Sequence, residues 1–301
     1  MSPPPVLALV GPTASGKSDV ALAVARARRD VRADPVELVA ADAFTIYRGM
    51  DVATAKPSAA DRDDVPHHLI DELEPSQDAT VAWFQQRARE VIAAIHDRGH
   101  VPLLVGGSGL YFRAVVDDLR FPPTDAELRS AIEQRFAGDP PAAHAALSEL
   151  DPDAAAKIAP DNLRRSVRAL EVIELTGQRF SAYDDSFERY ESIFPGLEVR
   201  GLNLDRIQLR ARIERRARSM VEGGLLAEAQ RLRDRRLSRT ARQAIGYAEA
   251  FAVLDGDAPA GGLVDAVTTR TWRYARRQLG WFRRDPRMVW SPPQAVVAAW
   301  T

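Results

Sequence analysis

The sequence predicts an α/β protein in which helices flank a parallel sheet, with an all-helical block inserted into the chain. Three short apolar runs are predicted to be buried strands, namely Val6–Val10, Val36–Ala41 and Val101–Val105. Segments with helical spacing lie between them, at Ser18–Arg29 and Val81–Arg98. Strands that alternate with helices are typical of a parallel sheet covered on both faces.

The first of these strands leads into a glycine-rich motif that is typical of phosphate-binding loops. Residues 11–18 read Gly-Pro-Thr-Ala-Ser-Gly-Lys-Ser and satisfy the pattern G-x-x-x-x-G-K-[ST]. Backbone N–H groups of such a loop, and the N-terminus of the following helix, bind phosphate oxygens. A lysine ammonium reaches between phosphates, and the serine hydroxyl is a ligand for Mg²⁺. The core is therefore expected to resemble a P-loop NTPase, with phosphate ligands at Gly11, Thr13, Ala14, Ser15, Gly16, Lys17 and Ser18.

The composition excludes several classes of protein. The chain has 301 residues and no cysteine, so disulfides and thiolate zinc sites are excluded. No apolar run reaches the roughly 18 residues of a membrane-spanning helix. The first residues lack the basic and apolar regions of a signal peptide. We therefore expect a cytoplasmic protein that has no membrane partner, and nothing in the sequence calls for a protein partner.

Charge is distributed unevenly along the chain. The net charge is −1, yet residues 201–301 contain 19 arginines against 10 acidic residues, which leaves residues 1–200 acidic. A basic segment of this kind indicates a polyanion such as a nucleic acid, because phosphate neutralisation dominates nucleic-acid affinity. Helix faces on which arginine pairs with glutamate are the alternative interpretation.

An all-helical block is predicted at residues 122–197, where Thr124 and Glu127 fit a capping box. The strand Glu198–Leu204 then returns the chain to the sheet, so the core is expected to combine residues 1–121 and 198–301. Arginine-rich helices are predicted within the second of these segments, at about 206–221, 223–236, 240–255 and 263–283.

Two further residues stand out near the ends of predicted strands. Asp42 follows the second strand, where a carboxylate can ligate Mg²⁺ through water or accept a proton, although a helix-capping role is the alternative. Lys56 is one of only three lysines, and it is either a substrate contact or a solvated loop residue. His67 and His68 invite a metal site, but no further ligand follows at a suitable spacing, so this interpretation is disfavoured.

Six blocks of the sequence together resemble the bacterial tRNA dimethylallyltransferase family. They are the phosphate loop, Asp42 to Pro57, Pro102 to Tyr111, Asp151 to Val172, Gln243 to Tyr247, and Tyr274 to Arg283. A phosphate loop alone occurs in many nucleotide-binding proteins, whereas these six blocks in this order are specific.

The resemblance implies transfer of a dimethylallyl group from its diphosphate to N6 of adenosine 37, beside the tRNA anticodon. It implies Mg²⁺, dimethylallyl diphosphate and the tRNA anticodon stem-loop as cofactor and substrates. Asp42 would be the general base, and Ser108 and Arg216 would also be catalytic, with Arg216 near the diphosphate. Arg276 would contact the diphosphate. The insertion would bind tRNA, and the residues implied as tRNA contacts are Thr45, Tyr47, Lys56, Arg164, Arg165, Arg168 and Gln243. Aromatic residues that could stack on an unpaired base are Phe44, Tyr111, Trp272, Tyr274, Trp281 and Phe282.

Three departures from the family pattern leave the charged groups intact, namely Ala43 where serine is usual, Ala53 where glycine is usual, and Gly280 where threonine is usual. Three alternatives stay open. The first is prenylation of free adenine nucleotides, against which the insertion and the basic C-terminal third argue. The second is a P-loop nucleotide kinase, and the third is a non-catalytic tRNA-binding protein.

Overall fold

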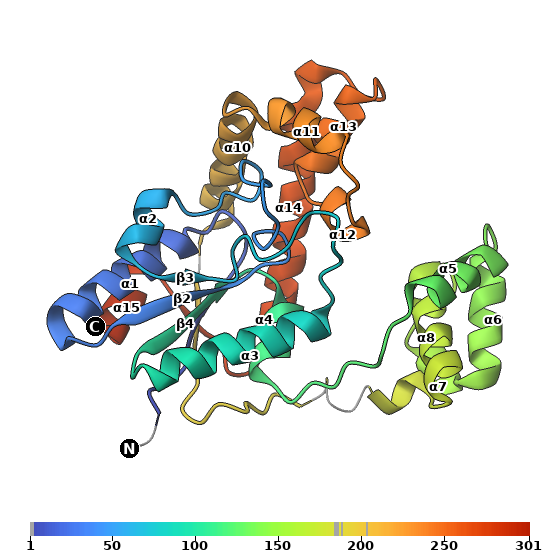
Figure 1. Ribbon diagram of the computed structural model, residues 1–301, viewed down its shortest axis with the longest axis horizontal. Helices are drawn as coiled ribbons and strands as arrows, with labels where there is room; N and C mark the ends of the chain where they lie inside the picture. The colour runs from blue at the N-terminus through green and yellow to red at the C-terminus, as the bar shows by residue number, and fades with distance from the viewer. Residues whose placement is uncertain (1–2, 184–186, 188, 203) are drawn as a thin grey trace. The chain divides into compact units, whose positions relative to one another are not determined.

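The computed structural model describes residues 3–183, 187, 189–202 and 204–301. It divides into two compact units, the first comprising Met1–Asp117 with Ser192–Thr301 and the second comprising Asp118–Glu191. Figure 1 shows the course of the chain through each unit.

The first unit is built around a six-stranded sheet in the order β3-β2-β4-β1-β5-β6, and every adjacent pair of strands is parallel. The predicted parallel α/β fold is therefore confirmed. The two short outer strands were not predicted, because two or three residues carry no periodic signal. The strands are β1 (Leu7–Val10), β2 (Val36–Ala41), β3 (His67–His68), β4 (Val101–Gly106), β5 (Glu198–Leu202) and β6 (Val289–Ser291).

Helices cover both faces of this sheet. On one face, Leu7 and Leu9 pack with the apolar sides of α1 (Lys17–Arg32) and α15 (Pro293–Trp300). On the other, Ala8 and Val10 pack with α3 (Val81–Asp97) and α4 (Gly109–Val116). The remaining helices of the first unit are α2 (Ala59–Asp64), α10 (Arg206–Glu222), α11 (Leu225–Arg233), α12 (Arg239–Arg242), α13 (Tyr247–Leu254) and α14 (Leu263–Phe282).

One predicted helix is wrong in its extent. Residues 240–255 form two helices, α12 and α13, instead of one. The chain leaves α12 at Gln243 and begins α13 after Gly246, whose φ of +96° is a backbone conformation that favours glycine and that a continuous helix cannot contain. A Cβ at Gly246 would also lie 2.7 Å from the Cβ of Ala53, so the turn needs glycine on both counts.

The second unit is helical, and its helices enclose their own small core. Ile132, Leu147, Val167 and Leu170 are buried together in it. The start of its first helix corrects the predicted capping box, because Asp125 caps the helix while the hydroxyl of Thr124 donates to Glu171. The helices are α5 (Ala126–Arg135), α6 (Pro140–Leu150), α7 (Pro152–Ala156) and α8 (Leu163–Thr176), followed by a 3₁₀ turn at Phe180–Tyr183.

Candidate active site

The phosphate loop connects β1 to the start of α1, as the motif predicts. Gly16 has a φ of +88°, and a Cβ there would lie 2.9 Å from a guanidinium nitrogen of Arg212. Glycine is therefore required both by the backbone and by the approach of this arginine. The free N–H groups at the N-terminus of α1 make the loop suited to binding an anion.

A cavity of about 740 Å³ opens beside this loop, at the carboxyl ends of the strands. Ligands of parallel α/β sheets bind at this edge, since the loops that follow the strands converge there. The cavity brings together Lys17, Ser18, Asp42 and Arg216, which the sequence singled out from three distant segments.

Lys17 is a half-buried lysine that lines this cavity. Its Nζ donates a 2.7 Å hydrogen bond to the carbonyl oxygen of Pro12. Burial, and to a smaller extent the charge of Arg216, lower the pKa of Lys17 to about 7, although the charge of Asp42 acts in the opposite direction. The lowered pKa means that the ammonium form of Lys17 is unfavourable in the free site. A bound anion would stabilise that form, so the site favours an anion.

Three arginines of α10 line the cavity opposite the phosphate loop. Arg212 donates to the carbonyl oxygen of Ser15 at 3.3 Å, and Arg216 donates to that of Thr54 at 3.4 Å. Burial lowers the pKa of Arg216, and the charge of Asp42 opposes this effect. Only Arg216 was assigned from the sequence. Arg212 and Arg215 were missed, although the positions 212, 215 and 216 share one helix face.

Asp42 follows directly after β2 and lines the same cavity. Its Oδ1 accepts a 2.8 Å hydrogen bond from the backbone N–H of Phe44, which fixes the direction of the carboxylate. It acts electrostatically on Lys17, Arg216 and Tyr274. A carboxylate held in this way beside two cations can accept a proton or support a metal ion.

Gln278 of α14 is a buried cavity residue to which the sequence gave no role. Its Oε1 accepts from the N–H of Thr13 at 2.9 Å, and its Nε2 donates to the carbonyl oxygen of Gly107 at 2.7 Å. It thereby fixes the phosphate loop relative to the turn after β4. Next to that turn, Ser108 caps α4 by accepting from the N–H of Tyr111 at 3.4 Å, and the Ser108 side chain does not line the cavity.

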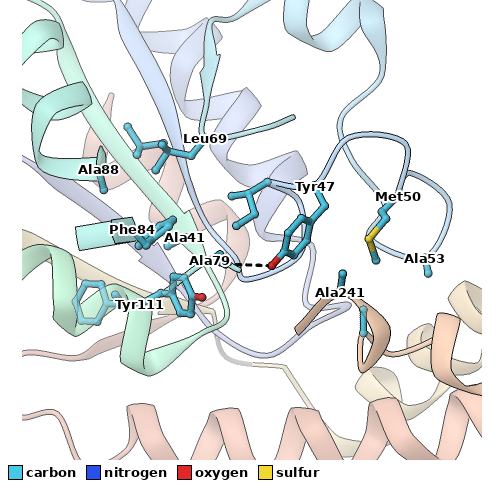
Figure 2. Close-up of a cluster of buried hydrophobic side chains, with 14 of the residues drawn as sticks. Ala41, Tyr47, Met50, Ala53, Leu69, Ala79, Phe84, Ala88, Tyr111 and Ala241 are labelled. Carbon is cyan, nitrogen blue, oxygen red and sulfur yellow. Dashed lines mark hydrogen bonds between the residues drawn. The ribbon is translucent and has the colours of Figure 1, made fainter. Parts of the chain in front are cut away.

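Two residues with an implied role in tRNA binding are engaged inside the protein. The ring of Tyr47 is fully buried, and its hydroxyl accepts hydrogen bonds from the N–H of Ala79 and the hydroxyl of Ser238 (Figure 2). Because the ring lies in the core, direct contact with a nucleic acid does not fit its position. Lys56 is 2% exposed, although it borders the cavity, and its Nζ donates to oxygens of Tyr47, Asp51 and Asp71.

The loop that carries Lys56 is held from behind by a buried carboxylate of α11. Glu228 accepts hydrogen bonds from the backbone N–H groups of Asp51 and Val52 and from the hydroxyl of Tyr247. Lys56 and Glu228 together fix this wall of the cavity, which favours a structural role for Lys56.

The remaining assigned residues lie in different environments. Thr45 borders the cavity, and its hydroxyl is buried with no hydrogen-bond partner among the described residues. Arg276 and Gln243 are exposed and do not line the cavity. In the second unit, Arg164 and Arg165 are exposed at the start of α8.

Arg168 differs from its two neighbours because it is tied into its own unit. It donates to the carbonyl oxygens of Pro122 and Pro123 and to the buried carboxylate of Glu171. Burial alone would raise the pKa of Glu171, but hydrogen bonds from Arg129 and Arg168 outweigh it and lower that pKa.

Neither histidine of the His67–His68 pair takes part in a metal-binding group of three or more His, Asp or Glu side chains among the described residues. His68 pairs with the buried Glu37 at 2.6 Å, and His67 binds the carbonyl oxygen of Val65 at 2.7 Å. Across the part of the chain that the structure describes, no helix is both long and apolar enough to span a membrane.

The amino-acid sequence is similar to those of known proteins over almost its whole length. The chain is 50% identical over 291 residues to a tRNA dimethylallyltransferase of Kineococcus radiotolerans, and the aligned region covers 96% of this chain and 90% of that protein. It is 46% identical over 288 residues to a tRNA dimethylallyltransferase of Bifidobacterium longum, covering 95% and 85% of the two chains.

Solved structures agree with this similarity. A tRNA isopentenylpyrophosphate transferase of Bacillus halodurans matches with a TM-score of 0.69 and 38% identity, over 98% of this chain and 94% of that one. A eukaryotic dimethylallyltransferase acting on tRNA shares the fold, with a TM-score of 0.79 at 23% identity. The match covers 97% of this chain and 75% of that one. The family model described as IPP transferase matches residues 45–285. The chain therefore belongs to the IPP transferase family.

Proposed function

We propose that this protein transfers a dimethylallyl group from dimethylallyl diphosphate to N6 of adenosine 37 in tRNA and releases diphosphate. The observation that carries the proposal is that one cavity joins the phosphate loop, the carboxylate of Asp42 and three arginines of α10. Relatives that match almost the whole chain are named tRNA dimethylallyltransferase, which supports transfer of a dimethylallyl group to tRNA.

The reaction places negative charge on the leaving diphosphate and positive charge on the attacking amine, and both must be stabilised. The allylic C1–O bond breaks and its electron pair leaves with the diphosphate, while the adenine amine forms the new C1–N6 bond. The phosphate loop, Lys17 and Arg216 would stabilise the negative charge that develops on the leaving group. Asp42 would accept the proton that N6 loses, so that the product amine is neutral.

Mg²⁺ fits the donor set of the cavity. Ser18 and Asp42, a hydroxyl and a carboxylate, both line it. Mg²⁺ is usually held by one or two protein groups together with substrate phosphates and water, so a larger cluster of acidic residues is not needed. When bound, the ion would neutralise charge on the diphosphate.

A tRNA substrate explains features that a small substrate does not. The basic C-terminal third and the exposed Arg164 and Arg165 offer contacts to phosphates. The target adenine must leave its stack to reach a cavity at the edge of a sheet. The substrates would contact three further residues when they bind, namely Thr45, Gln243 and Arg276. Ser108 would act from its position at the start of α4. Because the proposed substrate is tRNA, we expect the protein to act in the cytoplasm.

Transfer of the label from dimethylallyl diphosphate labelled in its prenyl carbons tests this proposal. The protein is incubated with the donor and with tRNA, AMP or ATP as the acceptor, and tRNA digests are examined for N6-isopentenyladenosine. We expect label in tRNA alone. Comparable labelling of AMP or ATP would favour the free-nucleotide alternative, and phosphoryl transfer from ATP without prenyl transfer would favour a kinase.

A further inference from the structure

One aromatic side chain stands apart from the others that could stack on a base. Trp281 of α14 is 42% exposed, whereas Tyr111 and Phe282 are 7% and 1% exposed and therefore belong to the core. Trp272 is covered by the guanidinium of Arg206, and Tyr274 by that of Arg277. Trp281 therefore offers an aromatic face to solvent, and unpaired bases stack on such faces.

The same face of α14 carries a stripe of arginines. Arg273, Arg277 and Trp281 follow one another at spacings of four residues and share one side of the helix, and Arg284 follows just beyond its end. All three arginines are exposed. The surface around Trp281 is therefore positively charged and suited to phosphate groups.

Trp281 also lies beside the cavity. A Cβ at Gly109 would be 2.8 Å from Cε3 of its indole, so part of the ring rests on the first residue of α4. Gly109 follows Ser108, and Gly107 lines the cavity. On α14, Trp281 is one turn beyond Gln278, which also lines it. The indole is thus anchored on one side next to the proposed reaction site and exposed on the other.

We propose that Trp281 is a stacking platform for an unpaired base that flanks the target adenosine, with the arginine stripe binding the adjoining phosphates. This inference rests on the proposed function, since it names how the same site holds its RNA substrate. An indole ring anchored on a glycine and surrounded by arginines has the chemistry of single-strand recognition, in which bases stack on aromatic rings and phosphates neutralise cations.

Binding of an anticodon stem-loop to Trp281→Ala, Trp281→Phe and Ile207→Ala tests the stacking role. Ile207 is an exposed apolar residue of α10 and serves as the matched control. We expect Trp281→Ala to weaken binding about ten-fold, within the range measured for loss of one base–aromatic stack, and Trp281→Phe to restore most of the affinity. Ile207→Ala should bind like the wild type.

The salt dependence separates stacking from charge. Trp281→Ala should leave the slope of log affinity against log salt unchanged, while Arg277→Ala should reduce its magnitude by about one unit. The fluorescent base 2-aminopurine, placed on either side of the target adenosine, should be quenched at one position on binding to the wild type and to Trp281→Phe but not to Trp281→Ala.

Equal affinity of Trp281→Ala and the wild type, or equal quenching in both, would overturn the inference. Binding of dimethylallyl diphosphate, measured on every variant, shows that each is folded. Failure of the inference is distinguishable from failure of the proposed function, because wild-type protein that prenylates tRNA while Trp281→Ala binds RNA normally would refute the stacking role alone.

Discussion

The side-chain oxygen of Gln278 accepts a 2.9 Å hydrogen bond from the backbone N–H of Thr13, although 265 positions separate the two residues in the chain. The amide nitrogen of the same side chain donates to Gly107. One buried carboxamide therefore sets the distance between the phosphate loop and the turn that leads to Ser108. The diphosphate and the adenine must approach each other across this distance.

Gln278→Met should keep the volume of the side chain and remove both hydrogen bonds. Each partner left buried and unsatisfied costs about 1–3 kcal/mol, so we expect a lower free energy of unfolding and a higher KM for dimethylallyl diphosphate. Gln278→Glu should raise that KM further, since a carboxylate cannot donate to Gly107 and adds negative charge to the cavity. Steady-state kinetics and urea unfolding measure both effects. The exposed Gln230 provides the control variant Gln230→Met, and an unchanged KM in Gln278→Glu would contradict the positioning role.

Lys17 should take up a proton when the allylic diphosphate binds. Its pKa is lowered to about 7 in the free protein, mainly by burial, so at pH 8 the amine is largely neutral. A bound diphosphate favours the ammonium and raises this pKa. Calorimetry of dimethylallyl diphosphate binding at pH 8, without tRNA or magnesium and in buffers of different ionisation enthalpy, should show uptake of close to one proton. Lys17→Met should abolish this uptake, and an equal uptake by the variant would exclude Lys17 as its source.

The same lowered pKa makes the stability of the free protein depend on pH. Between about pH 7 and the ordinary value of 10.5, the unfolded chain holds a proton on Lys17 that the folded chain has lost. The contribution of Lys17 to the free energy of unfolding therefore rises with pH across this range and is smallest below about pH 7. Urea unfolding of the wild type and Lys17→Met at pH 7 and pH 9 checks the sign. The difference between the two proteins should shift in favour of the wild type at the higher pH, and a shift in the opposite direction would contradict the assignment.

Arg165 and Arg168 should respond differently to replacement, although they lie on the same helix. Arg165→Ala should weaken tRNA binding and leave the stability intact, because the side chain is exposed. Arg168→Ala should destabilise the protein by about 2 kcal/mol, because it removes a partner of a buried carboxylate. Thermal unfolding and filter binding of tRNA distinguish the two. Loss of stability in Arg165→Ala, with equal loss of affinity for tRNA and for diphosphate, would show that Arg165 is structural.

The parts of the fold that carry strong local signals could be predicted from the sequence. The strands β1, β2 and β4 are continuous apolar runs, and the phosphate loop has a fixed pattern of glycine, lysine and serine. The strands β3 and β6 are too short to show a period, and they form because neighbouring strands offer free hydrogen-bonding edges. The break before α13 depends on contact between Gly246 and Ala53, which are distant in the chain.

Within the site, the charged residues that lie in recognisable motifs could be predicted from the sequence. The residues whose role depends on contacts with distant segments could not. Asp42, Lys17 and Arg216 line one cavity as expected. The role of Gln278 depends on two partners far from it in sequence, so no local pattern could reveal it. Tyr47 looked like a nucleic-acid contact within its motif, yet it is a buried residue of the core (Figure 2).

The single-turnover rate of prenyl transfer by Asp42→Asn tests the central claim most directly. Asparagine keeps the size of the side chain and an oxygen for the N–H of Phe44, but it has no negative charge with which to accept the proton of N6. A general base acts mainly in the transition state, so its loss should lower the rate more than the affinity. We predict tRNA binding close to that of the wild type and transfer that is at least ~100-fold slower at saturating substrate. A near-normal rate, or lost tRNA affinity with unchanged chemistry, would contradict the assignment of Asp42 as the base.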